Sequence, residues 1–142
     1  MKTFKSIVMG LALLIVCGVA NASTKANHGN LTKEEVIDTY LDAVVHGKLT
    51  GIENAIDDDA QFNMMRGENV NTLNKKQLLA SLQGSENIEQ DCKCTSKIVQ
   101  DDDNTVIRKV EMKYADFTRT DVITAQRSGN NWKITKVETS YN

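Results

Sequence analysis

Two stretches in the first half of the chain carry apolar residues at helical spacing. Thr32 and Glu35 open the first stretch at the spacing of a capping box, in which a hydroxyl and a carboxylate satisfy each other's backbone N–H groups. Its apolar positions are Val36, Ile37, Tyr40, Leu41, Val44 and Val45. Gly47 suits the end of a helix, so the pattern predicts a one-faced helix of about four turns.

The same capping spacing occurs twice more. Asn74 and Gln77 predict the start of a helix that ends at Gly84 and has Leu78, Leu79 and Leu82 as its buried stripe. Thr50 and Glu53 predict a short helix between these two. We expect that short helix to end at Asp57, Asp58 and Asp59.

Strand patterns fill the rest of the chain. Residues 60–66 and 70–73 flank Gly67-Glu68-Asn69, which predicts a hairpin. Turn clusters at residues 101–104, near Asp116 and at residues 128–131 then separate four predicted strands, at residues 88–100, 105–115, 117–127 and 132–139. Helices followed by a long antiparallel meander predict an α+β fold, with three helices packed on one face of a curved sheet.

The N-terminal segment has the pattern of a secretory signal peptide. Lys2 and Lys5 precede an unbroken apolar run at residues 7–16, and Ala20-Asn21-Ala22 offers a cleavage site of small residues. The run is too short for a stable membrane span. Val16, rather than a small residue, precedes Cys17, which argues against a lipoprotein signal.

These features predict how the chain is organised and where it acts. We expect cleavage after residues 1–22, a flexible lead-in at residues 23–30 and a single domain at residues 31–142. The protein would then be exported to the periplasm or the extracellular space, with no membrane contact after cleavage. About 120 residues are enough for one hydrophobic core and too few for two.

Charge changes the picture only slightly. Loss of two lysines with the signal would lower the formal net charge from −2 to about −4. No stripe of Lys and Arg with interleaved aromatic residues then remains, so we expect no nucleic-acid partner.

The order of the predicted elements resembles the nuclear-transport-factor-2-like superfamily. The closing stretch RSGNNWKI, residues 127–134, followed by the basic Lys136, is similar to exported bacterial proteins catalogued as "putative lumazine-binding". The agreement in element order covers about 110 residues from Leu31 onward. The resemblance implies a cone in which the sheet curls round the first helix and leaves an apolar pocket open at one end. It also implies a homodimer packed through the sheet, and lumazine or flavin as the ligand.

The stretch QDCKCTS places Cys92 and Cys94 two positions apart. In a strand such residues stand about 6.5–7 Å apart, whereas the Cβ atoms of a disulfide need about 3.5–4.5 Å, so a bond between them requires a kink. We interpret both as small apolar residues on one face with Ile88 and Ile98. A strained local disulfide or a link between subunits is the alternative in an oxidising compartment.

The same residues give little support for a metal site or a redox motif. Zinc requires four ligands, or three and a water, and the only histidines are His28 in the lead-in and His46 at the end of the first helix. The spacing is not Cys-x-x-Cys. The acidic runs 57–59 and 101–103 lack an EF-hand pattern and are typical of helix ends and turns. We therefore expect neither metal nor cofactor.

One charged residue lies in phase with apolar neighbours. Arg108 shares a strand face with Val106, Val110, Met112 and Tyr114. If this face lines the pocket, the guanidinium could bind a carboxylate through two hydrogen bonds. Alternatively, Arg108 reaches solvent or pairs with an acidic residue of the short second helix.

The favoured hypothesis is an exported protein that binds a small, partly apolar molecule without turning it over. The candidate pocket consists of Tyr40, Val44, Met64, Arg108, Met112 and Tyr114, with the thiols of Cys92 and Cys94 nearby. A homodimeric accessory or interaction module with a vestigial pocket is one alternative, favoured if Met64 and Met112 close the pocket.

The other alternative is an isomerase or dehydratase of the ketosteroid-isomerase or polyketide-cyclase type. A carboxylate pointing inward beside Tyr40 would favour it. Tyr40, Tyr114 and Asp116 are residue types that such enzymes use, but no spacing matches their motifs. A shared fold does not by itself give activity, so no catalytic residue is assigned.

Overall fold

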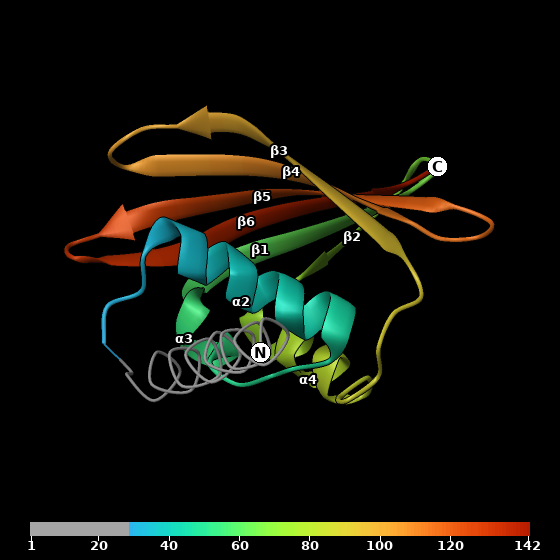
Figure 1. Cartoon of the computed structure of the whole chain (residues 1–142), viewed down its shortest axis with the longest axis horizontal. Coiled ribbons are helices and arrows are strands. Elements are labelled where there is room, and N and C mark those ends of the chain that lie inside the picture. The colour runs from blue at the N-terminus through green and yellow to red at the C-terminus, as the bar shows by residue number, and fades with distance from the viewer. Residues whose placement is uncertain (1–28) are drawn as a thin grey trace, which may run out of the picture.

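The computed structural model describes residues 29–142, so the predicted signal peptide and most of the lead-in lie outside the described residues. The elements, in chain order, are α2 (Lys33–His46), α3 (Ile52–Ala55), β1 (Ile56–Arg66), β2 (Asn69–Leu73), α4 (Lys75–Gln83), β3 (Lys93–Asp101), β4 (Thr105–Lys113), β5 (Thr118–Ser128) and β6 (Asn131–Tyr141). Figure 1 shows an open, curved sheet with the helices gathered on one face. The α+β prediction is confirmed.

The strands of this sheet follow the order β2-β1-β6-β5-β4-β3. Neighbours are antiparallel except β1 and β6, which run parallel and bring the first strand beside the last. The predicted meander from β3 to β6 is present. The parallel pairing was not predicted, because local sequence patterns carry no information on which distant strands become neighbours.

Helix α2 has the predicted ends. The Glu35 backbone N–H donates to the Thr32 hydroxyl, and the Thr32 N–H donates to the Glu35 carboxylate, which completes the capping box. Gly47 ends the helix at φ +65°, where a Cβ atom would lie 2.6 Å from the backbone nitrogen of Ile88. This position therefore requires glycine for both its conformation and its space.

The predicted start is confirmed for α4 and wrong for α3. Asn74 and Gln77 form the predicted capping box of α4. The expected cap of the short helix is wrong, because α3 follows Gly51 in the left-handed region without a side-chain hydrogen bond. The helix also stops at Ala55 rather than at the aspartates, since Ile56 is already extended and pairs with β6.

The predicted strand at residues 88–100 begins five residues too early. Asn87 has a positive φ of 62°, and its N–H donates to the Gly47 carbonyl. The Gln90 N–H donates to the Val45 carbonyl over 2.7 Å. These bonds bind the segment of residues 87–92 to the C-terminal end of α2, so β3 starts only at Lys93.

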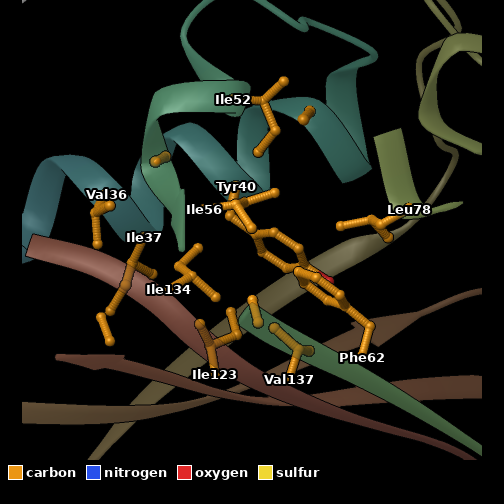
Figure 2. Packing of buried hydrophobic residues seen from close by; sticks show 14 of the residues in the cluster. Val36, Ile37, Tyr40, Ile52, Ile56, Phe62, Leu78, Ile123, Ile134 and Val137 are labelled. Carbon is orange, nitrogen blue, oxygen red and sulfur yellow. The ribbon is translucent and has the colours of Figure 1, made fainter. Parts of the chain in front are cut away.

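The core lies between α2 and the central strands of the sheet (Figure 2). Tyr40, Ile37 and Val36 of α2 meet side chains of β1, β5 and β6, among them Phe62, Ile123 and Val137. We call the face of the sheet that packs against α2 the inner face. All nine residues of β3 are exposed, because this edge strand lies beyond the cover of the helices.

Candidate functional site

A carboxylate is buried at the centre of the inner face. Asp121 of β5 is fully buried and lies opposite Thr139 of β6. Its Oδ1 accepts hydrogen bonds from the Thr139 hydroxyl at 2.8 Å and from Arg119 Nε at 2.9 Å. Its Oδ2 accepts from Arg119 Nη2 at 2.9 Å and from the Tyr40 hydroxyl at 3.1 Å. These four residues form the Arg119 cluster.

The charges of the Arg119 cluster compensate each other. Burial lowers the pKa of Arg119, but the adjacent Asp121 carboxylate more than offsets this and raises it overall. Burial, with a further contribution from Asp121, raises the pKa of Tyr40 well above its usual 10.0. Tyr40 therefore remains a neutral hydroxyl donor, and Arg119 remains a cation.

One edge of the Arg119 guanidinium faces away from Asp121. The bond to Asp121 uses the edge formed by Nε and Nη2. Within residues 29–142, these hydrogen bonds use two of the five N–H donors that an arginine carries. The remaining end-on edge consists of Nη1 and the second Nη2 hydrogen. The Arg119 side chain as a whole is 16% exposed. Such an edge can bind a carboxylate or phosphate through two parallel bonds.

An aromatic groove adjoins this end of the sheet. Tyr141 lies opposite Arg119 in the β5–β6 pairing, and the guanidinium of Arg66 lies 5.0 Å from the centre of its ring. The rings of Tyr114 and Phe117 stack at 4.5 Å, with Phe117 42% exposed. A hollow of about 380 Å³, the rim groove, is lined by Arg66, Gly67, Phe117 and Tyr141.

Most of the predicted pocket residues lie in or beside the Arg119 cluster. Tyr40 belongs to it, Met64 pairs with Thr139, and the fully buried Met112 pairs with Arg119. Tyr114 is partly buried, and its hydroxyl donates to Gln90 Oε1 over 3.2 Å. Val44 is partly buried on α2 against the core.

Arg108 lies on the inner face as predicted, but apart from this cluster. It pairs with Ile123, which is four residues from Arg119 on β5, or about 13 Å along the strand. Arg108 Nη1 lies 3.7 Å from Asp38 Oδ1 of α2, so the alternative in which Arg108 pairs with an acidic residue of the short second helix is wrong. Its Nε is buried and has no hydrogen-bond partner among the described residues.

Sequence reasoning missed Arg119, Asp121 and Thr139. The signal was available in the stretch RTDVITA, where Arg119 and Asp121 alternate in phase with the inward positions Ile123 and Ala125. Two opposite charges in phase with the core face of a strand indicate a buried ion pair. Only the fold supplies the tyrosine and threonine that complete it.

Cys92 and Cys94 are free thiols with their Sγ atoms 3.8 Å apart. Cys94 and Ile98 share a face of β3, as expected, but Cys92 and Ile88 precede that strand. This face is not a covered apolar surface, because Cys94 is exposed and Ile98 is 54% exposed. Burial and the neighbouring Cys92 raise the pKa of Cys94 to about 11.

Residues 29–142 contain no group of three or more His, Cys, Asp or Glu side chains arranged to hold a metal ion. Within the same range, no helix combines the length and the apolar character needed to cross a membrane.

Residues 31–140 match the sequence pattern of the family described as "Putative lumazine-binding". The chain belongs to this family. No protein with a curated description matches it.

Solved structures show the same fold at low identity. A nuclear-transport-factor-2-like protein of unknown function from Silicibacter pomeroyi is 17% identical, with 75% of this chain and 88% of that chain covered and a TM-score of 0.60. A protein from Parabacteroides distasonis described as a "putative ketosteroid isomerase" is 18% identical, with 79% and 89% covered and a TM-score of 0.56. This chain therefore has the nuclear-transport-factor-2-like fold.

Proposed function

We propose that this protein binds a small, partly apolar anion at the Arg119 end of the sheet and does not turn it over. The observation that carries the proposal is the orientation of Arg119. Asp121 holds one edge of the guanidinium in place, and the other edge is left to meet a ligand. A charged group held by a buried partner needs little reorganisation on binding, which favours affinity.

The rim groove supplies the apolar part of the site. Phe117 and Tyr141 offer ring surfaces beside Arg119, and Arg66 adds a second cation. Aromatic walls with a few placed polar groups are typical of small-molecule sites. The family description points to lumazine-like rings, which are planar and could stack on such walls.

An isomerase-type activity is the second candidate function. Two observations favour it: a carboxylate does point inward beside Tyr40, and one of the similar structures is described as a "putative ketosteroid isomerase". However, Asp121 already accepts four hydrogen bonds, two of them from a cation. These bonds occupy the four lone-pair sites of the carboxylate and leave none for a substrate proton, so Asp121 is poorly placed to act as a general base.

Export and assembly belong to the same proposal. The signal-like residues 1–22 support release to the periplasm or the extracellular space. We also propose a homodimer packed through the sheet. If the rim groove holds no ligand, the homodimer would instead act as an interaction module with a vestigial site.

Native mass spectrometry of protein purified from an exporting host tests the proposal. We expect a bound small mass, or uptake of lumazine, flavin or an aromatic carboxylate added at increasing concentrations. Arg119→Lys keeps the charge beside Asp121 but loses the paired N–H donors, so it should weaken binding at least tenfold. Arg108→Lys is the matched control and should leave binding unchanged.

Other outcomes would redirect the proposal. Loss of binding in Arg108→Lys alone would move the anion contact to Arg108. A folded homodimer that takes up none of these compounds would favour the interaction module. Conversion of a ketosteroid, abolished by Asp121→Asn in a folded variant, would favour the isomerase.

A further inference from the structure

Cys92 and Cys94 are placed for a reaction that the proposed binding function does not use. Their Sγ atoms lie 3.8 Å apart, which is van der Waals contact. Cys94 is fixed in β3 by its pairing with Met112 of β4. Cys92 precedes β3, and its N–H donates to the Gln90 carbonyl in a local turn. This turn is the kink that the sequence pattern required before the two thiols could meet.

Only a small local movement separates these thiols from a bond. A disulfide has an S–S distance of about 2.05 Å, so the sulfur atoms must approach by roughly 2 Å. Within residues 29–142, Cys92 makes no pairing with β4, and its backbone N–H bonds only the nearby Gln90 carbonyl, so Cys92 can rotate without breaking the sheet. Cys94 is exposed and open to a partner from solution.

We infer that Cys92 and Cys94 form a reversible disulfide within one chain when they meet a disulfide donor. One thiolate attacks a sulfur of the donor, forms a mixed disulfide and releases the first donor thiol. The second cysteine then attacks its neighbour's sulfur and releases the other donor thiol. The pair loses two electrons and two protons, and the donor disulfide is reduced to two thiols.

Two other uses of these thiols fit the structure less well. Dithiol catalysts use a Cys-x-x-Cys motif at the start of a helix, whereas Cys92 and Cys94 have one residue between them and Cys94 lies in a strand. A stable zinc site requires at least three protein ligands, and the described residues contain no such group around the pair. The structure therefore favours a modification over catalysis or metal binding.

The disulfide would act on the edge of the candidate ligand site. Residues 87–92 are already bound to α2 through the Gln90–Val45 and Asn87–Gly47 backbone bonds. Cys92 also lies close enough to Tyr114 to contribute, after burial, to the raised pKa of that phenol, about 12. A bond to Cys94 would thus connect α2, β3 and the Tyr114 side chain more rigidly. The cellular occurrence of this bond rests on the proposed export, because disulfides persist in oxidising compartments.

Mass spectrometry can test the inference on protein purified from an exporting host. The protein is equilibrated with reduced and oxidised glutathione at set ratios, alkylated and weighed intact. We expect a loss of about 2 Da and two blocked thiols at oxidising ratios, with full return on reduction. Trypsin cuts after Lys93, between the two cysteines, so the disulfide should link peptides 77–93 and 94–97.

Variants and alternative outcomes make the test decisive. Cys92→Ser and Cys94→Ser should each leave one thiol that binds a single glutathione and forms no linked peptide. Two alkylatable thiols after equilibration with excess oxidised glutathione would overturn the inference, as would a link between two chains. Thiols blocked by a copper or zinc ion that a chelator removes would overturn it in favour of a metal site.

The outcomes remain separable from those of the proposed function. The glutathione experiment requires no ligand, so its failure would leave the Arg119 proposal untouched. Conversely, a protein that binds no small molecule could still form the linked peptides. Protein that arrives reduced but oxidises with glutathione would confirm the chemistry and contradict only the proposed oxidising location.

Discussion

Two arginines on the inner face show how differently the same side chain can be held. Arg119 forms two 2.9 Å bonds with a fully buried carboxylate that also binds a tyrosine and a threonine. Arg108 lies 3.7 Å from Asp38, whose side chain is 69% exposed, and its Nε has no partner among the described residues. The alternation of residues along β4 predicted that Arg108 points to the inner face. The carboxylate beside an arginine decides whether it is fixed for binding.

Asp121→Asn should have the largest effect, because it leaves the Arg119 cation buried without its counter-charge. We expect the free energy of unfolding to fall by about 3–5 kcal/mol. Urea denaturation followed by circular dichroism measures this. Asp38→Asn removes the exposed partner of Arg108 and should change stability by less than about 0.5 kcal/mol. Equal losses in the two variants would show that the two ion pairs do not differ.

Tyr40→Phe removes a single hydrogen bond from the same carboxylate. We expect a loss of about 1–2 kcal/mol in urea denaturation at neutral pH. Tyr114→Phe removes a hydroxyl that bonds a half-exposed glutamine and should cost less. A smaller loss in Tyr40→Phe than in Tyr114→Phe would mean that Asp121 does not require the phenol.

Alkaline titration sharpens the same comparison. The unfolded Tyr40 phenol loses its proton near pH 10, whereas burial holds the folded pKa well above 10.0. The folded state then binds more protons, so stability should fall as the pH rises past about 10. The decline should be shallower in Tyr40→Phe than in the unaltered protein, measured as melting temperature against pH. Identical slopes would contradict the burial of this phenol.

Arg108→Met should have a small effect of either sign, within about 1 kcal/mol. The substitution removes a weak ion pair but also removes a buried Nε without a partner, and it keeps an unbranched apolar side chain. Thermal unfolding measures the change. Arg119→Met is the matched variant and should be destabilised severalfold more. A loss above about 2 kcal/mol in Arg108→Met would show that its contact with α2 is structurally important.

Raising the salt concentration should have the smallest effect on the stability of the two ion pairs. The pair of Arg108 with exposed Asp38 is open to screening, whereas the fully buried Asp121 is shielded from ions. The stability difference between the unaltered protein and Asp38→Asn should therefore vanish at about 1 M salt. The difference caused by Asp121→Asn should persist. The contrary result would place Asp121 in contact with solvent.

Most parts of the fold that depend on local chemistry were predictable, and the cap expected at Thr50 and Glu53 is the exception. The capping boxes at Thr32 and Asn74 and the turn at Gly67 lie where the sequence places them, because each involves residues within a few positions of one another. The start of β3 was not predictable in this way. Backbone bonds from Asn87 to Gly47 and from Gln90 to Val45, which join this segment to the distant end of α2, decide it.

In the candidate site, too, local patterns predict some residues and contacts between distant elements decide the others. The strand period alone places Arg108, Met112 and Met64 on the inner face. The Arg119 cluster joins α2, β5 and β6, and its fourth member, Thr139, carries no charge or motif that would have drawn notice. Sites assembled from three distant elements become visible only when the register between strands is known.

The position of β6 in the sheet order has a consequence for how the chain is made. This strand, the last along the chain, lies between β1 and β5 and separates the two halves of the sheet. A ribosome or a translocation channel delivers the chain from its N-terminal end. Strand β1 therefore cannot pair with β6, its neighbour on the side away from β2, until the rest of the described chain has been delivered. The contacts that close the core span most of the sequence, and such contacts form slowly. A chain built in this order keeps its core incomplete until β6 has emerged, whatever the route by which it is delivered.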